Sequence, residues 1–257
     1  MLSTEDRNFD DLQEKFERKI YGSYKGDLRL KLIWDDLEQH TSLLPNLSSL
    51  SILDIGGGLG QFSIRLAQLG ARIDYCDISI KMLQRAEEEA KAAGVADNIR
   101  FIHAPFQQLT NYHIHYDFIV MHAVLEWLGD QRAALQLLQA LLRPDGVISL
   151  MYFNFHSIVL KNMVRGNFKN IIKANYAGSK KSLTPTNPVK PGQCNQWIDD
   201  LGFQRLTETG IRCISDYHDH VESWQRHERE KLLEAELALC KTQPYLYWAR
   251  YIHLLLK

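Results

Sequence analysis

The sequence lacks the marks of several protein classes. It contains no apolar run of about 18 residues, so no membrane-spanning helix is predicted. The N-terminus has no basic segment followed by an apolar one, and we expect a cytoplasmic protein rather than a secreted one. The four cysteines, Cys76, Cys194, Cys213 and Cys240, include no C-x-x-C pair. Reduced thiols are therefore favoured over disulfides, and no metal site is predicted.

One long stretch lacks negative charge. No Asp or Glu lies between Asp145 and Asp199. Seven of the chain's 30 basic residues lie in this stretch: Lys161, Arg165, Lys169, Lys173, Lys180, Lys181 and Lys190. The net charge of the whole chain is only −1, so this basic block belongs to an otherwise acidic protein. Such a block indicates a dedicated anionic partner rather than general attraction to anions.

A short apolar run that ends in glycines is the centre of the chain. Residues 51–55 predict a buried strand, the glycines after it predict a tight turn, and residues 61–69 have helical spacing. The pattern is not the dinucleotide-binding G-x-G-x-x-G, because Gln61 stands at the third glycine position. It is D-x-G-x-G-x-G, formed by Asp54, Gly56, Gly58 and Gly60, and it resembles the first motif of the class I S-adenosylmethionine (SAM) methyltransferases. Glycines allow the backbone to approach a ligand closely, and an acid can bind a cationic amino group.

Alternating strands and helices follow the glycine turn. Asp77 ends a second strand over 72–77, about 20 residues after the glycines, where an acid can bind both ribose hydroxyls. Further strands are predicted over 98–104, 116–122, 146–154 and 203–214, with helices over 81–93, 128–142, 193–201 and 222–240. A last strand over 245–256 is expected to be antiparallel and to lie between its neighbours. We therefore predict an α/β, Rossmann-like class I methyltransferase fold with a seven-stranded, mostly parallel sheet.

One domain over 1–257 is predicted, with two additions to the basic fold. Two helices joined at Tyr21–Gly26 are expected to form a lid over the ligand within residues 1–45. Arg29 follows this joint and is a candidate to bind the SAM carboxylate, with a solvated helix arginine as the alternative. A basic insertion over 155–192, after the fifth strand, is expected to overhang the site where a substrate enters.

Segments along the whole chain resemble those of the tRNA 5-carboxymethoxyuridine methyltransferases, which methylate the carboxylate on the wobble uridine of certain bacterial tRNAs. The segments are Asp6–Asp11, Lys19–Gly22, His122–Trp127, Asn162–Phe168 and Tyr247–His253. The resemblance implies SAM as cofactor and the anticodon stem-loop of tRNA as partner. Together with the glycine motif it gives these cofactor-binding candidates: Arg29, Asp54, Gly56, Gly57, Gly58, Gly60, Asp77, Ile78, Pro105, Phe106, Gln107 and His122. We expect His122 to pack against the cofactor or in the core rather than to act as a base.

Methylation of a carboxylate makes few chemical demands on the protein. A carboxylic acid with a pKa of roughly 4 is ionised at neutral pH, so no general base is required. What remains is placement of one carboxylate oxygen in line with the methyl group, with the other held by a cation or an amide. Candidates for this clamp are Tyr152, Asn154, Arg165 and Arg250. Candidates for binding tRNA are Lys161, Arg165, Lys169, Lys180 and Lys181.

Three other functions stay open from the sequence. The protein could methylate a small acidic or quinone-type metabolite, which would make the basic insertion only a lid. It could transfer a carboxymethyl group from a carboxylated SAM to hydroxyuridine, a reaction that needs an extra cation near the sulfonium. It could also bind SAM as a regulator without turnover. RNase sensitivity, product mass and turnover distinguish these functions, and the sequence predicts no oligomeric state.

Overall fold

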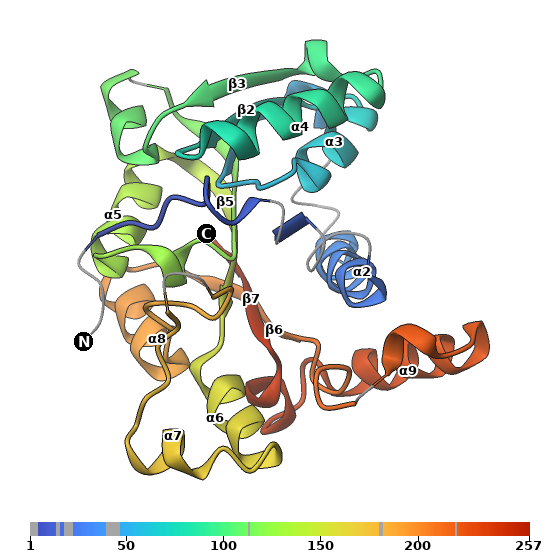
Figure 1. Cartoon of the computed structure of the whole chain (residues 1–257). Helices are drawn as coiled ribbons and strands as arrows, with labels where there is room; N and C mark the ends of the chain where they lie inside the picture. The colour runs from blue at the N-terminus through green and yellow to red at the C-terminus, as the bar shows by residue number, and fades with distance from the viewer. Residues whose placement is uncertain are drawn as a thin grey trace.

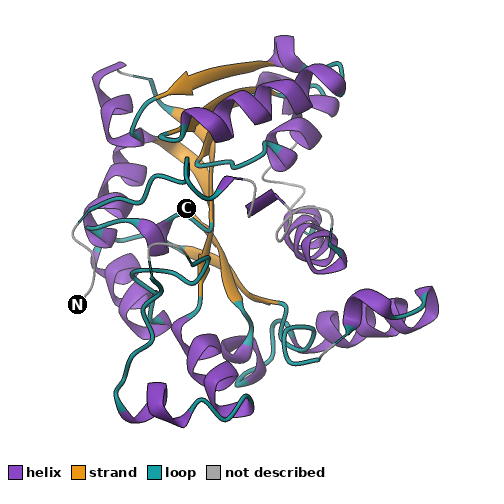
Figure 2. Ribbon diagram, viewed as in Figure 1, coloured by secondary structure: helices purple, strands orange, loops and turns teal. Residues whose placement is uncertain are grey.

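The computed structural model describes residues 5–13, 16–17, 23–39, 47–112, 114–179, 182–218 and 220–257. A seven-stranded sheet runs through the molecule with helices on both faces (Figures 1 and 2). The strand order is β3-β2-β1-β4-β5-β7-β6. Neighbours from β3 to β5 pair in parallel, and β7 is antiparallel to both β5 and β6. The predicted fold class is confirmed, including the antiparallel last strand between its neighbours.

The strands are β1 (Ser51–Ile55), β2 (Arg72–Asp77), β3 (Ile99–His103), β4 (Tyr116–His122), β5 (Leu142–Phe153), β6 (Arg205–Ile211) and β7 (Tyr251–Leu256). The helices are α2 (Tyr24–Glu38), α3 (Gln61–Gln68), α4 (Ile80–Ala92), α5 (Gln131–Leu141), α6 (Phe155–Val164), α7 (Phe168–Ile172), α8 (Pro191–Asp200) and α9 (Arg226–Leu239). Two short 3-10 helices also matter for the site, η5 (Leu125–Trp127) and η7 (Tyr245–Trp248).

Some predicted boundaries are wrong because caps and turns decide where an element begins. The helix expected from residue 128 begins at Gln131, because the Asp130 side chain accepts a hydrogen bond from Ala133 N at 2.9 Å and caps α5. The helix expected from residue 222 begins at Arg226, where a capping box starts α9. The last strand begins at Tyr251, because the residues before it form η7.

The two faces of the central strands belong to two different parts of the core. Along β5, Met151 and Phe153 pack with α2 and α3 side chains on one face, whereas Leu150 and Tyr152 pack with α5 and α8 side chains on the other. Both faces are buried, as is usual where helices cover a parallel sheet on both sides. The face that carries Met151 and Phe153 is the one on which the functional site is built.

Residues 5–13 cross the carboxyl ends of the parallel strands. Asp6 Oδ2 accepts a hydrogen bond from Gln107 Nε2 at 2.7 Å, and Asn8 Nδ2 donates to Ile78 O at 3.2 Å. The first of the two predicted lid helices is wrong for residues 8–12, which have no regular structure or lie in turns. The joint predicted at Tyr21–Gly26 is wrong at Tyr24–Gly26, which form the first turn of α2. Residues 1–4, 14–15, 18–22 and 40–45 of the predicted lid lie outside the described residues.

The basic insertion extends from the end of β5, at the bottom of the molecule in Figure 1. It consists of α6, α7 and an irregular segment that leads to α8, which starts at Pro191. Lys180 and Lys181 lie outside the described residues. Within the described ranges, no helix is both long and apolar enough to cross a membrane.

Candidate functional site

A cavity lies at the carboxyl ends of β1, β2 and β4, and we call it the cofactor cavity. Eleven of the twelve predicted cofactor residues line it: Arg29, Asp54, Gly56, Gly57, Gly58, Asp77, Ile78, Pro105, Phe106, Gln107 and His122. The twelfth, Gly60, caps α3 with φ +75°, and a Cβ there would lie 3.2 Å from Ala86 Cβ. Gly60 therefore has a packing role, whereas ligand binding by the other eleven stays a prediction.

The glycine turn has no room for side chains. Gly56 has φ +61°, and a Cβ on it would come within 2.6 Å of Val124 Cγ2. A Cβ on Gly57 would come within 2.6 Å of Asp54 Oδ2. Glycine alone fits both positions, so the bare backbone of the turn forms part of the cavity wall. This cradle has the form that a nucleoside ligand needs at the start of a helix.

Two buried acids give the cofactor cavity its chemistry. Asp54 accepts a hydrogen bond from Ser63 Oγ at 2.6 Å, and burial, with the nearby charge of Asp77, raises the pKa of Asp54 to about 7. Burial also raises the pKa of Asp77 to about 6, against hydrogen bonds from Ser79 N at 2.8 Å and Tyr75 OH at 3.3 Å. Both groups are stabilised in their ionised form by donors and by positive charge. The residues therefore fit SAM, which carries an ammonium group and ribose hydroxyls.

A buried hydrogen-bonded chain starts at His122 in the cavity wall. The His122 ring contacts Ser149 Oγ at 2.8 Å, Ser149 Oγ contacts the His253 ring at 2.8 Å, and His253 contacts Asp36 Oδ2 at 2.7 Å. Burial lowers the pKa of His122 well below its usual value, so the ring is neutral. A neutral ring fixed from behind supports the expectation that His122 packs against the cofactor rather than acting as a base.

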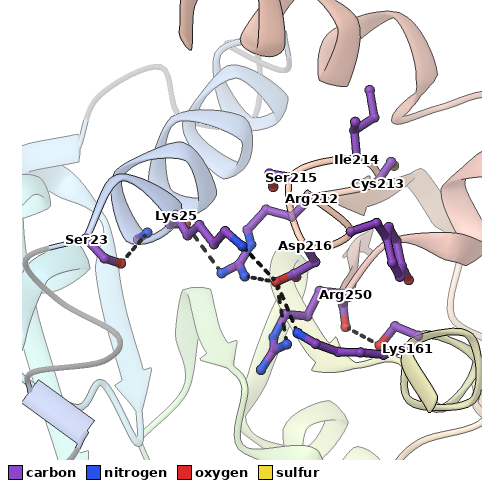
Figure 3. A network of polar contacts seen from close by, with 12 residues as sticks. Ser23, Lys25, Lys161, Arg212, Cys213, Ile214, Ser215, Asp216 and Arg250 are labelled. Carbon is purple, nitrogen blue, oxygen red and sulfur yellow. Dashed lines mark hydrogen bonds and ion pairs between the residues drawn. The ribbon is translucent and has the colours of Figure 1, made fainter. Parts of the chain in front are cut away.

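A second cavity contains a cluster of four basic side chains around one acid, which we call the Asp216 cluster (Figure 3). Asp216 Oδ1 lies 2.5 Å from Arg212 Nη2, 3.6 Å from Arg250 Nη1, 3.8 Å from Lys161 Nζ and 4.0 Å from Lys25 Nζ. Burial raises the pKa of Asp216, but the four cations outweigh burial and hold it well below its usual range. One carboxylate among four cations leaves a net positive charge that attracts a further anion.

The two cavities share a wall formed by Phe153, Leu183 and Tyr251. The guanidinium of Arg250 lies 4.6 Å from the centre of the Phe153 ring, on the side of the Asp216 cluster. Burial lowers the pKa of Lys161 to about 8, although Asp216 opposes the shift. A cavity whose acids fit a cationic cofactor thus adjoins a positively charged cavity, with apolar and aromatic side chains between them.

Two of the four predicted clamp residues are in the wrong place for that role. Tyr152 is fully buried on the opposite face of β5, where it packs against Cys194 and Ile198. Asn154 is fully buried, and its side chain accepts from His156 N at 2.9 Å and donates to Tyr247 O at 2.7 Å and Ala249 O at 2.9 Å. Neither residue lines either cavity. Arg165 and Arg250 do line the second cavity.

The insertion presents charged and apolar side chains to solvent. Arg165 and Lys169 are exposed on α6 and α7. They accompany four large apolar side chains that are at least half exposed: Met163, Val164, Phe168 and Ile172. Such a mixture of cations and exposed apolar groups is unusual for a surface without a partner.

Sequence reasoning missed Lys25, Arg212, Asp216, Glu126 and Tyr251. The first three meet only in the folded chain, and no local motif marks them. Glu126 and Tyr251 stand inside segments that carry the family resemblance, and alternation from His253 would have placed Tyr251 on the same face of β7. In the described part of the chain, no group of three or more His, Cys, Asp or Glu side chains could hold a metal ion.

Comparisons with known proteins show which family the chain resembles. Residues 52–146 match the model of a methyltransferase domain family. The chain is 42% identical to the tRNA 5-carboxymethoxyuridine methyltransferase of Escherichia coli, over 97% of this chain and 95% of that protein. It is 24% identical to the ubiquinone/menaquinone biosynthesis C-methyltransferase UbiE of Shewanella halifaxensis, over 63% of this chain and 69% of that one.

Two solved structures share the fold. The magnesium protoporphyrin IX methyltransferase of Synechocystis with bound SAH is 20% identical with a TM-score of 0.60, and the match covers 96% of this chain and 95% of that one. A SAM-dependent methyltransferase of Thiobacillus denitrificans in complex with S-adenosyl-L-homocysteine is 16% identical with a TM-score of 0.57, over 98% and 99% of the two chains.

Proposed function

This chain belongs to the tRNA 5-carboxymethoxyuridine methyltransferase family, and we propose that it transfers the methyl group of SAM to the carboxylate of 5-carboxymethoxyuridine at the wobble position of tRNA. The product is the methyl ester. The observation that carries this proposal is the shared wall between the cofactor cavity and the Asp216 cluster. A carboxylate attracted by the cluster would lie next to the methyl donor. A place in the cytoplasm is part of the same proposal.

The reaction requires positioning more than proton transfer. SAM supplies a methyl group on a positively charged sulfur, and transfer to an ionised carboxylate moves no proton. The residues of this chain therefore bind and orient SAM and the substrate carboxylate, and they exclude water from the site. Phe153, Leu183 and Tyr251 form an apolar and aromatic boundary at the meeting point of the two sites, where a carboxylate and a sulfonium lose charge together. Holding the two groups in line supplies about 7–11 kcal/mol at the upper end of measured effects.

Arg250 is the strongest candidate for the carboxylate clamp. Its guanidinium lies over Phe153, and its Nε has no hydrogen-bond partner among the described residues. Its Nη1 is 3.6 Å from Asp216, which fixes the group without using all of its donors. Arg165, at the end of α6, is more exposed and is placed to meet a phosphate as the base enters.

The insertion is the proposed tRNA-binding surface. Lys161, Arg165 and Lys169 would contact phosphates of the anticodon stem-loop, and the exposed Phe168 ring would stack on an unpaired base. Lys180 and Lys181 remain part of this proposal. The alternative function is methylation of a small acidic or quinone-type metabolite. In that case, RNase treatment of the acceptor would not remove the activity.

The test uses purified protein, labelled SAM and tRNA from cells that lack the last methylation step. We expect label in tRNA, loss of the signal after RNase treatment of the acceptor, and at least a hundredfold lower rate for Arg250→Ala. Arg100→Ala is the control, because Arg100 is an exposed residue on β3 that pairs with Asp74. If Arg250→Ala transfers methyl groups to tRNA at the wild-type rate, Arg250 is not the carboxylate clamp. If the wild-type protein transfers no label to tRNA, the proposed function is wrong.

A further inference from the structure

Glu126 is a buried acid to which neither the cofactor set nor the Asp216 cluster gives a role. It lies in η5, directly after β4, in the wall of the cofactor cavity, and only 1% of the residue is exposed. Its Oε2 atom has no hydrogen-bond partner among the described residues. Burying a polar atom without a partner is costly, so a carboxyl at such a position indicates a ligand.

The turn that carries Glu126 is fixed at three successive carbonyl oxygens. Gln131 Nε2 donates to Leu125 O at 3.1 Å, Asn187 N donates to Glu126 O at 3.1 Å, and Arg7 N donates to Trp127 O at 3.0 Å. These contacts come from α5, from the basic insertion and from the N-terminal segment. The backbone of the turn is therefore held from three sides, which keeps Glu126 in the wall of the cavity, as a residue that recognises a ligand requires.

The surroundings of Glu126 place it on the acceptor side of the cofactor cavity. The backbone N–H of Phe153 and the charge of Arg250 both act on its carboxyl, and Phe153 belongs to the wall shared with the Asp216 cluster. Burial outweighs these effects and raises the pKa of Glu126 to about 8. At neutral pH the group is mostly protonated, with one O–H donor beside one carbonyl acceptor.

We propose that Glu126 binds the uracil edge of the acceptor nucleotide, accepting a hydrogen bond from N3–H and donating one to O4. The inference rests on the proposed function. Uracil offers a donor next to an acceptor on this edge, and a protonated carboxyl is its complement. The ammonium group of SAM has donors only and is matched by Asp54, while Asp77 is matched to the ribose hydroxyls, elsewhere in the cavity. Glu126 is thus a residue that determines specificity, not an acid or a base in the transfer.

Two substitutions separate recognition from packing. Glu126→Gln keeps one donor and one acceptor, so kcat and KM for a modified anticodon stem-loop should stay within threefold of wild type. Glu126→Leu keeps the bulk and removes both groups, so KM for the stem-loop should rise at least tenfold while the Kd of SAM stays unchanged. Its melting temperature should fall by no more than a few degrees, because removal of the unpartnered Oε2 atom offsets the loss of the bond from Phe153 N–H.

A change in the substrate completes the test. In a stem-loop whose acceptor uridine carries a methyl group on N3, wild type should lose as much activity as Glu126→Leu loses with the normal stem-loop. Glu126→Leu should not distinguish the two stem-loops. Unchanged KM in Glu126→Leu would overturn the inference, and so would a raised Kd of SAM in either variant, which would assign the carboxyl to the cofactor. If wild type methylates no stem-loop at all, the proposed function has failed and the inference falls with it.

Discussion

We expect the ionisation of two acids, Asp54 and Asp77, to change when a ligand binds. Both acids are buried, and both have raised pKa values, about 7 for Asp54 and about 6 for Asp77. In the unliganded protein, stability falls as pH rises through these values, because the unfolded chain ionises its carboxyls at a pH of about 4 without penalty. The ammonium group and the ribose hydroxyls of bound SAM reverse the balance and favour the ionised acids. SAM binding should therefore release protons.

We expect the affinity for SAM to rise with pH from about 5 to about 7 and then to level off. Asp54→Asn should weaken binding by about tenfold or more and flatten this pH dependence, because it removes a charged acceptor. Titration calorimetry in buffers of different ionisation enthalpy measures both the affinity and the protons released. Asp97→Asn, an exposed acid outside the cavity, is the control. Equal affinity across the range in wild type would show that the two acids do not meet the charge of the cofactor.

Tyr152 and Asn154 differ in what their side chains hold, although both are fully buried. The Tyr152 hydroxyl interacts with the weakly hydrogen-bonding thiol of Cys194 and with no stronger partner among the described residues. Tyr152→Phe should therefore change the free energy of unfolding by less than about 1 kcal/mol and leave methyl transfer intact. Asn154→Ala removes three hydrogen bonds and should lower the free energy of unfolding by about 2–3 kcal/mol. Urea denaturation measures both. Loss of transfer in a stable Tyr152→Phe protein would restore Tyr152 as a clamp.

At the scale of elements, residues 5–13 act as a strap over the cofactor cavity. Asp6 joins two loops, because it accepts hydrogen bonds from Gln107 Nε2 at 2.7 Å and Gly129 N at 2.9 Å. The Phe9 ring packs edge-on against Trp127 at 4.8 Å between centroids. The strap therefore connects the loops that follow β3 and β4 beside the cofactor cavity, and we expect its opening to limit ligand release.

Asp6→Ala should speed dissociation of SAM by about tenfold, which corresponds to about 1.4 kcal/mol. Stopped-flow displacement measures this rate. Asp11→Ala is the matched control, because Asp11 forms a solvent-exposed ion pair with Arg7, and such pairs contribute little. Equal release rates for Asp6→Ala and wild type would show that the strap does not hold the cofactor.

The insertion carries a prediction about tRNA affinity. Arg165→Ala and Lys169→Ala should each weaken tRNA binding and reduce the slope of log K against log salt by about 0.7–0.9. Filter binding over a range of salt concentrations measures the slope, and calorimetry should show unchanged SAM affinity. Lys91→Ala on α4 is the control, since α4 lies at the opposite end of the molecule in Figure 1. If Lys91→Ala reduces the slope as much as Lys169→Ala does, the surface proposed for tRNA is wrong.

Local signals in the sequence were sufficient to predict the strands and the helix around the cofactor cavity. The apolar run, the glycines and the helical spacing lie next to one another in sequence, and β1, β2 and α3 match their predicted ranges within one residue. The face of the sheet to which each side chain of a central strand points was not predictable. Both faces of β5 carry apolar side chains, so the sequence has no polar alternation that marks one face. Nothing in the pattern therefore shows that Phe153 faces the cavity and Tyr152 faces away. The Asp216 cluster was beyond sequence reasoning, since Arg212 and Lys25 are 187 residues apart.

At the scale of the whole molecule, one sheet carries both halves of the site. β1, β2 and β4 end at the cofactor cavity, while β5 and β7 contribute Phe153 and Tyr251 to the wall shared with the Asp216 cluster. The sheet is continuous from β3 to β6. This arrangement supports the proposal that residues 1–257 fold as one domain, in which the donor and the acceptor are positioned by a single rigid framework.

The most direct test of this account is the mass of the wobble nucleoside. tRNA that carries 5-carboxymethoxyuridine is incubated with the protein and SAM, digested to nucleosides and analysed by mass spectrometry. We expect the acid to be replaced by a nucleoside heavier by one CH2 group, and mild alkaline hydrolysis should return the acid, as for a methyl ester. An unchanged acid, or a methyl group that survives alkaline hydrolysis, would contradict carboxylate methylation.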